Sequence, residues 1–145
     1  MIAVWRITKR RYADLSGTGA KLAGGRWNSP GVAVVYCADH SALAALEVRV
    51  HLDLPPELLP DDFVLMKIEL PDEPPEEIRA IPPDPRVFGD HWIALGRMAV
   101  LRVPSILVPD AFNYLLNPVH PNAANAKPTD IRPFSFDARL WSGPT

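Results

Sequence analysis

The sequence GVAVVYCADHSALAALEVRVHL occupies residues 31–52, and the other segments can be placed around it. Its first part, residues 31–36, is a short apolar run rich in valine, which predicts a buried strand. Asp39 or Ser41 can then cap a helix that reaches about Leu52, because alanine and leucine dominate these positions. A buried strand followed directly by a helix is therefore the starting unit of the fold.

The segments on either side predict more strands than helices. The spacing of Trp92, Leu95 and Ala99 indicates one further helix over residues 88–101, with Gly96 as a weak point. Short runs of β-forming residues predict strands at 2–7, 63–70, 103–108 and 131–136. The connections are a glycine-rich loop at 8–31, a proline-stiffened excursion at 71–85 and a turn-rich stretch at 113–121. Because helices do not alternate regularly with strands, the pattern favours an α+β fold, with mixed sheets and a few helices, over a doubly wound sheet.

Length and composition indicate one domain that spans residues 1–145. Hydrophobic residues make up 48% of the chain, which is enough for one sizeable core, and the formal net charge is only −2. This charge gives no reason to expect wholesale binding to nucleic acid or to a membrane surface. Cys37 is the only cysteine, the N-terminus lacks a signal-peptide pattern, and no apolar run approaches the roughly 20 residues of a membrane span. We expect a reduced, cytoplasmic protein without a membrane segment.

Basic residues are concentrated near the N-terminus. Residues 1–38 hold six of them and one acidic residue, and the cluster GGRWN lies within this segment at 24–28. Paired glycines let backbone N–H groups approach a ligand closely. Arg26 presents a planar fork that suits phosphate oxygens, and Trp27 offers a face for a flat ring. The cluster predicts ligand binding, and its alternative is a glycine turn that the tryptophan anchors.

Glu47 is the second candidate for a functional residue. On the predicted helix, Leu43, Leu46 and Val50 mark an apolar face by their three- and four-residue spacing, and Glu47 shares that face. A carboxylate there must be paired, neutral or at the wall of a cleft, because burying a lone charge is costly. The alternative is a glutamate at the edge of the apolar stripe with its carboxylate in water.

Other motifs give weaker predictions. Gly17-Thr-Gly19 lacks the full glycine spacing of dinucleotide- and phosphate-binding loops. Cys37 and His40 are spaced like half a metal site, but no second pair has ligand spacing, so we expect no metal. Cys37 also lacks a local activating motif, and we expect a buried, unreactive thiol. Lys9-Arg-Arg11 raises a nucleic-acid-binding module as an alternative function, which the negative net charge and the absence of a recognised motif oppose.

Taken in order along the chain, these motifs resemble RES-domain toxins of bacterial toxin–antitoxin pairs. The resemblance runs nearly end to end through WR at 5–6, GGRWN at 24–28, VVY at 34–36, ALAALE at 42–47, GDHW at 89–92, VPS at 103–105, NP at 117–118, HP at 120–121 and FDARL at 136–140. It implies an ADP-ribosyltransferase-like fold and growth arrest through breakdown of NAD at its nicotinamide–ribose bond, by hydrolysis or phosphorolysis. It also implies an Xre-type antitoxin partner, a homodimer within the toxin–antitoxin complex, NAD as substrate, no further cofactor, and no direct nucleic-acid binding by this chain.

The resemblance assigns roles to particular residues. Its catalytic set is Glu47, Arg26, Tyr36 and Ser105, and its substrate-binding set is Arg6, Arg26, Trp27, Asn28, Tyr36 and Asn117. A carboxylate beside the ribose would stabilise an oxocarbenium-like transition state, which gives Glu47 its role. The arginines would hold the pyrophosphate, an aromatic ring would stack on nicotinamide, and Ser105 would bind the ribose or orient Glu47.

Two points stay open. The acceptor of ADP-ribose is water, phosphate or a protein side chain, and modification of a protein target would use the same residues. Members of the family often carry a threonine before the Gly-Asp-x-Trp segment, where this chain has Arg86-Val-Phe88, so the resemblance implies no contacts at that position.

Overall fold

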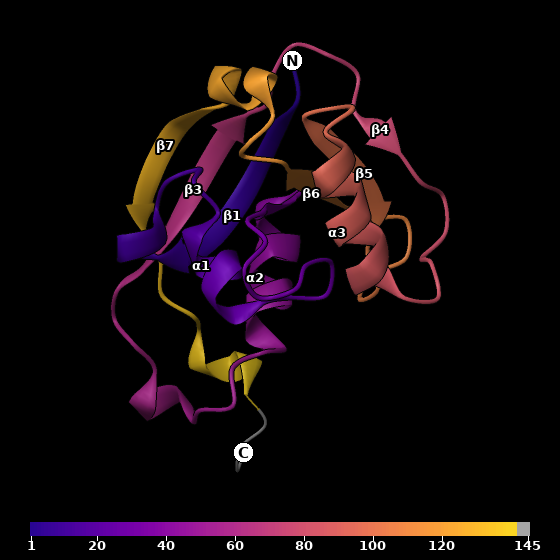
Figure 1. Cartoon of the computed structure of the whole chain (residues 1–145). Helices are drawn as coiled ribbons and strands as arrows, with labels where there is room; N and C mark the ends of the chain where they lie inside the picture. Colours follow the sequence, from indigo (N-terminus) through magenta and orange to yellow (C-terminus); the bar gives the residue numbers. More distant parts are fainter. Residues whose placement is uncertain (142–145) are drawn as a thin grey trace.

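The computed structural model describes residues 1–141, in which seven strands form one mixed sheet and three α-helices lie against it (Figure 1). The elements are β1 (Ala3–Lys9), α1 (Thr18–Ala23), β2 (Val35–Ala38), α2 (Ser41–Arg49), β3 (Phe63–Glu69), β4 (Glu76–Glu77), α3 (Pro85–Leu95), β5 (Val100–Pro104), β6 (Phe112–Leu116) and β7 (Lys127–Pro133). Short 3₁₀ turns lie at Arg10–Tyr12, Pro56–Leu58, Pro121–Asn125 and Ala138–Leu140. The predicted α+β fold is confirmed. No helix within the described residues is both long and apolar enough to cross a membrane.

Strands β1 and β2, in the middle of the sheet, share only one residue pair. Its order is β4-β5-β6-β2-β1-β3-β7, and only the β4–β5 pair is parallel. β1 pairs with β3 along its whole length, but it pairs with β2 only where Trp5 faces Ala38. The sheet therefore consists of two halves, β1–β3–β7 and β2–β6–β5–β4, which part at the β1–β2 junction. This parting leaves room for a pocket.

Three hydrophobic clusters hold the two halves and the helices together. One joins the halves directly and includes Val4 and Met66 from one half and Val35 and Leu116 from the other. A second packs α3 against β5 and β6, and the third packs α2 against β1 and β2. α3 therefore packs on one half of the sheet, whereas α2 lies across the β1–β2 junction and packs on one strand from each half.

Several element boundaries differ from the sequence prediction. The run at 31–36 becomes a strand only from Val35, and His40 caps α2 in place of Asp39 or Ser41, because its Nδ1 accepts the Ala42 N–H at 2.9 Å. α3 begins earlier than predicted, at Pro85, and ends earlier, because Gly96 takes a left-handed conformation with φ of 60°. The residues after Gly96 then form β5 instead of a last helical turn.

Other predictions missed or displaced whole elements. Four of the five residues of β6 lie in the stretch at 113–121 that was predicted to be turn-rich, and the short helix α1 lies within the predicted loop at 8–31. The closing strand β7 starts four residues before the prediction, which began at Ile131. The predicted strand at 103–108 lies mostly in a turn, since β5 ends at Pro104. The proline-rich excursion is confirmed, because residues 71–84 contain only the two-residue strand β4.

The apolar face of α2 also differs from the prediction. Leu43 and Ala44 are buried, whereas Leu46 and Val50 are 40% and 51% exposed. The predicted face was therefore wrong for Leu46 and Val50. The small alanines of α2 let the helix approach β1 and β2, so the face turns toward Ala44 and keeps Glu47 on the inner side.

Helix α3 presses closely on the loop that precedes β2. A Cβ added to Gly89 would lie 1.8 Å from the carbonyl oxygen of Trp27, so only glycine fits at this point of the helix. Asp90 accepts hydrogen bonds from the backbone N–H of Ser29 at 2.8 Å and from its hydroxyl. The helix thus supports residues 27–29 from one side.

We predict that Gly89→Ala lowers the free energy of unfolding by about 1–3 kcal/mol, because the methyl group forces the helix and the Trp27 carbonyl apart. Gly19→Ala is the matched control, since its Cβ would meet the Tyr12 ring at an ordinary 3.4 Å inside a helix. Denaturant unfolding of both variants measures the difference. Equal stability of Gly89→Ala and the wild-type protein would contradict the close approach.

Candidate active site

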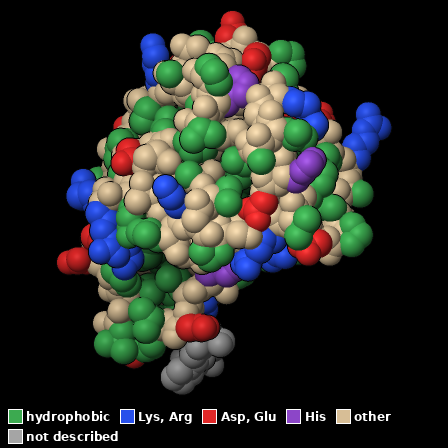
Figure 2. Space-filling model, viewed as in Figure 1, with side chains coloured by type: hydrophobic (Ala, Val, Ile, Leu, Met, Phe, Trp, Pro, Cys, Tyr) green, Lys and Arg blue, Asp and Glu red, His purple; other side chains and the backbone are tan. Residues whose placement is uncertain are grey.

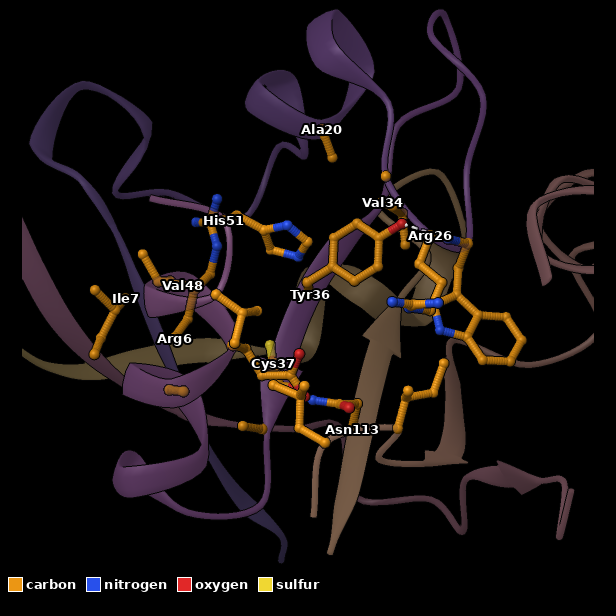
Figure 3. A pocket seen from close by; sticks show the side chains of 18 of the residues that line it. Arg6, Ile7, Ala20, Arg26, Val34, Tyr36, Cys37, Val48, His51 and Asn113 are labelled. Carbon is orange, nitrogen blue, oxygen red and sulfur yellow. Dashed lines mark hydrogen bonds between the residues drawn. The ribbon is translucent and has the colours of Figure 1, made fainter. Parts of the chain in front are cut away.

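A pocket of about 900 Å³ opens where the two halves of the sheet part, between α2 and α3 (Figure 3). Its polar lining comes from segments far apart in the sequence. The charged and polar residues that line it include Arg6, Arg26, Tyr36, Glu47, His51, Asp84, Arg86 and Asn113. The rest of the wall is largely apolar. Figure 2 shows the face that carries α1, α2 and α3, where basic side chains are interspersed with hydrophobic ones.

The GGRWN cluster forms a tight turn at the pocket. Gly25 N–H donates to the carbonyl oxygen of Asn28 at 3.0 Å, which leaves Arg26 and Trp27 at the tip. A Cβ on Gly25 would lie 2.7 Å from the hydroxyl oxygen of Tyr36, so glycine is required here by the close approach of the tyrosine. The turn is therefore built against β2.

Asn28 is the centre of this turn. Its side chain is completely buried, and its Nδ2 donates to the carbonyl oxygens of Ala20 and Val32, each at 2.9 Å. Its Oδ1 accepts the hydroxyl of Tyr36 at 2.6 Å. The resemblance predicted a substrate contact for Asn28, but the structure uses its amide to join α1, the turn and β2.

Trp27 and Arg26 separate at the tip of the turn. Trp27 is only 4% exposed and packs edge-on against Phe88, with ring centroids 6.1 Å apart. Of the two roles considered from the sequence, anchoring of the turn is the one that this burial supports. Arg26 is exposed and extends into the pocket, and among residues 1–141 its guanidinium has no hydrogen-bond or ion-pair partner. Its donors are available to a ligand.

Tyr36 supports the turn with its hydroxyl and faces the pocket with its ring. The hydroxyl donates to Asn28 and accepts the Trp27 N–H at 2.9 Å, and burial raises the pKa of this hydroxyl to about 12. The phenol is therefore protonated at neutral pH and already engaged. In Figure 3 the ring lies in the middle of the pocket, with His51 on one side and Arg26 on the other.

Arg6 reaches the pocket from β1. Its Nη1 donates to the carbonyl oxygens of Tyr12 at 2.8 Å and Asp14 at 2.9 Å, and burial lowers the pKa of this guanidinium from its ordinary value. The side chain thus ties the chain after β1 back onto the strand. Its other nitrogens remain as donors along the pocket wall.

Glu47 enters the pocket from α2 and is held by Ser105. The Ser105 hydroxyl oxygen accepts the N–H groups of Leu107 at 3.1 Å and Val108 at 3.2 Å. Its hydrogen is then directed to Oε1 of Glu47 at 3.4 Å, a long hydrogen bond. Ser105 does not line the pocket, and its hydroxyl contacts Glu47. Of its two predicted roles, binding of the ribose and orientation of Glu47, this position fits the second, and both stay predictions.

Asn117 lies away from this site. Its side chain is completely buried, Nδ2 donates to the carbonyl of Ile93 at 3.1 Å, and Oδ1 accepts the Val119 N–H at 3.2 Å. It follows β6 at the end opposite Asn113, which does line the pocket. The structure therefore gives Asn117 a structural role in place of the predicted substrate contact.

Among the charged and polar lining residues named above, the sequence analysis did not select His51, Asp84, Arg86 and Asn113. His51 lies four residues after Glu47, a spacing that could have indicated a shared helix face. Arg86 enters from the second residue of α3, and no local pattern relates it to the distant GGRWN turn. Asn113 was assigned to a turn-rich stretch, which hid its place on a strand.

Cys37 lines the pocket but has no reactive character. It is buried, and burial raises the pKa of its thiol to about 12, as expected for an unreactive cysteine. Within the described residues, no group of three or more histidine, cysteine, aspartate or glutamate side chains could hold a metal ion. The charged groups of the pocket are therefore guanidinium groups and carboxylates, which suit a ligand that carries both anionic and cationic parts.

Comparisons with known proteins identify the family. The sequence matches the RES domain over residues 3–137. A relative from Sphingobium sp. strain YBL2, named Prs ADP-ribosylating toxin, is 42% identical over 154 residues, and the alignment covers 94% of each chain. A relative from Pseudomonas putida KT2440, named Toxin Res, is 40% identical over 146 residues, which cover 95% of this chain and 99% of the relative.

The fold is also found in a solved structure. A chain in the crystal structure of the M. tuberculosis MbcT-MbcA toxin-antitoxin complex superposes with a TM-score of 0.76 at 18% identity, covering 92% of this chain and 84% of the other. At this identity the likeness concerns the fold. Together with the match over residues 3–137 and the full-length relatives, it completes the evidence that this chain belongs to the RES-domain family of toxins.

Proposed function

We propose that this toxin uses NAD as a substrate and breaks the bond between nicotinamide and ribose. The observation that carries the proposal is the Glu47 carboxylate, which Ser105 orients in the pocket that also contains Arg26 and Arg6. The volume of about 900 Å³ lies in the range of pockets that bury small-molecule ligands. An enzyme of this kind would act in the cytoplasm, where NAD is available.

The chemistry fits one carboxylate and several cations. The bond between ribose C1′ and the pyridinium nitrogen breaks with its electron pair on nitrogen, so nicotinamide leaves as a neutral molecule and needs no general acid. C1′ gains the positive charge of an oxocarbenium-like transition state, which the negative charge of Glu47 stabilises. An oxygen of the acceptor then bonds to C1′ and releases its proton to solvent. With water as acceptor the products are nicotinamide, ADP-ribose and a proton, and with phosphate the sugar product is phosphorylated.

The arginines provide for the anionic part of the substrate. Arg26 offers a complete planar fork, which matches the oxygens of a pyrophosphate. The ring of Tyr36 faces the pocket and is suited to stacking on the flat nicotinamide. In this proposal Asn28 supports the turn without touching the substrate, because its side chain is completely buried.

A second candidate is transfer of ADP-ribose to a protein. It is favoured by the name of the Sphingobium relative, which describes an ADP-ribosylating toxin. The leaving group and the carboxylate are the same, and only the acceptor differs. Release of nicotinamide without an added protein supports hydrolysis or phosphorolysis, whereas release that requires a cell extract and labels a protein supports transfer.

We also propose an antitoxin partner of the Xre type that closes the pocket, because the chain belongs to a toxin family and shares its fold with a chain of a toxin–antitoxin complex. Exposed apolar side chains at the pocket, Val50, Ile106 and Leu107, are 51%, 46% and 38% exposed. Arg26 lines the same pocket. An apolar segment that ends in a carboxylate would fit both features. A homodimer within such a complex remains part of this proposal.

The first test concerns Glu47. Purified wild-type protein should release nicotinamide from NAD, and Glu47→Gln should release it about 10²–10³ times more slowly, because the variant keeps the shape but loses the negative charge. Glu57→Gln, at an exposed carboxylate outside the pocket, is the matched control. Thermal unfolding checks that each variant folds. Full turnover by a folded Glu47→Gln variant would place the catalytic carboxylate elsewhere.

The second test concerns Arg26. Arg26→Lys keeps the charge but loses the planar fork, so KM for NAD should rise about tenfold while kcat changes little. Steady-state nicotinamide release gives both constants. Arg79→Lys changes an exposed arginine outside the pocket and should leave them unchanged. Wild-type kinetics in Arg26→Lys would remove this side chain from the binding site.

The third test concerns the antitoxin. Ile106→Asp should weaken binding to the antitoxin by about tenfold or more, since it places a carboxylate in the proposed apolar contact. Leu58→Asp, at a leucine 63% exposed and outside the pocket lining, should not. Calorimetric titration compares the affinities. A structure of the complex in which the pocket is fully open would refute closure by the partner.

A further inference from the structure

Arg86 makes two hydrogen bonds to the GGRWN turn, and the proposed function gives this arginine no role. It is the second residue of α3, it is exposed, and it lines the pocket. Its Nε and Nη2 both donate to the carbonyl oxygen of Gly25, each at 3.2 Å. A guanidinium fork that closes on one carbonyl from two nitrogens fixes the direction of that carbonyl.

The carbonyl of Gly25 belongs to the peptide group that links Gly25 to Arg26. The other side of this turn is already fixed, because Gly25 N–H donates to Asn28 and the Tyr36 hydroxyl packs against Gly25. Arg86 therefore fixes the peptide plane from which the Arg26 side chain extends. The Arg26 guanidinium has no hydrogen-bond or ion-pair partner within the described residues. The position of this residue is therefore fixed through its backbone.

The two arginines also form one region of positive charge. Burial raises the pKa of the Tyr36 hydroxyl, and the positive charges of Arg26 and Arg86 both lower it to a smaller extent. The N-terminal end of α3 lines the same pocket. The negative groups on this side are Asp84 and Asp90. Asp84 caps α3 by accepting the Val87 N–H at 3.2 Å, and Asp90 is engaged by Ser29. Two of the Arg86 nitrogens are occupied by the Gly25 carbonyl, so the cation on this side that has all its donors available to an anionic ligand is Arg26.

We propose that Arg86 is a positioning residue for Arg26 and that, through it, the enzyme selects substrates that carry a diphosphate. The inference rests on the proposed cleavage of NAD. Nicotinamide riboside contains the same bond to nicotinamide but no phosphate, so its cleavage does not depend on the Arg26–Arg86 region. In this proposal Arg86 contributes to binding of the dinucleotide and not to bond cleavage at Glu47.

The experiment compares NAD with nicotinamide riboside in wild-type protein, R86Q and R86K. For NAD, both variants should raise KM about tenfold with kcat within about twofold, because neither Gln nor Lys reproduces the two-nitrogen fork. For nicotinamide riboside, kcat/KM should not change. In a double-mutant cycle, R86Q should add little to R26Q, since Arg86 acts through Arg26. R79Q is the control for loss of an exposed arginine.

Two results would overturn the inference. One is an unchanged KM for NAD in folded R86Q, and the other is an equal loss for NAD and nicotinamide riboside, which a merely structural role would give. Calorimetric titration with ADP-ribose tests Arg86 separately from the cleavage chemistry. If the wild-type protein binds ADP-ribose and R86Q binds it about tenfold more weakly, the inference stands even when no nicotinamide is released, whereas equal affinities overturn it.

Discussion

The turn at residues 25–28 is fixed by hydrogen bonds within the protein, and the shape of the pocket depends on them. Asn28 holds it to α1 and to Tyr36, the Tyr36 hydroxyl accepts the Trp27 N–H, and α3 supports it from the other side. Asn28 is completely buried, so loss of a hydrogen bond to its amide leaves an unsatisfied polar atom, at a cost of about 1–3 kcal/mol. Such a network makes the turn rigid, and a rigid turn is what allows the exposed side chain of Arg26 to be aimed without any partner of its own.

The carboxylate of the site is positioned in a different way. Glu47 lies on α2, whose Leu43 and Ala44 pack against β1 and β2, so its backbone is fixed by packing in the protein interior. Ser105 then orients the carboxylate from β5 and the turn that follows it. α2 packs across the β1–β2 junction and α3 packs on β5 and β6, so Glu47 and Arg86 are held by different hydrophobic clusters.

Much of the fold follows from local sequence signals, and the exceptions have physical causes. Strands β1 and β3 and helix α2 were predicted from periodicity, and the inward direction of Glu47 was correct although Leu46 on the same predicted face is exposed. β6 was missed because asparagine and proline near its end are turn residues, while the strand is held by pairing with β2 and β5. In the candidate site, residue type identified Arg26 and Glu47. It could not separate side chains that face the ligand from those, such as Asn28, that support the turn, and it gave no signal for Arg86, whose contact spans 61 residues.

The arrangement also limits which groups take part in the proposed chemistry. A tyrosine hydroxyl with a pKa of about 12, which already donates one hydrogen bond and accepts another, is a poor proton acceptor at neutral pH. The buried thiol of Cys37 is unsuited to nucleophilic attack for the same reason. In the proposed reaction, the group that we place beside the sugar is the carboxylate of Glu47, with the arginines farther along the pocket wall. A reaction whose leaving group departs neutral needs no proton donor at that step, so a site with one oriented carboxylate is sufficient for breaking the bond to nicotinamide. In this proposal the acceptor is whichever of water, phosphate or a protein side chain reaches C1′ from the open side of the pocket.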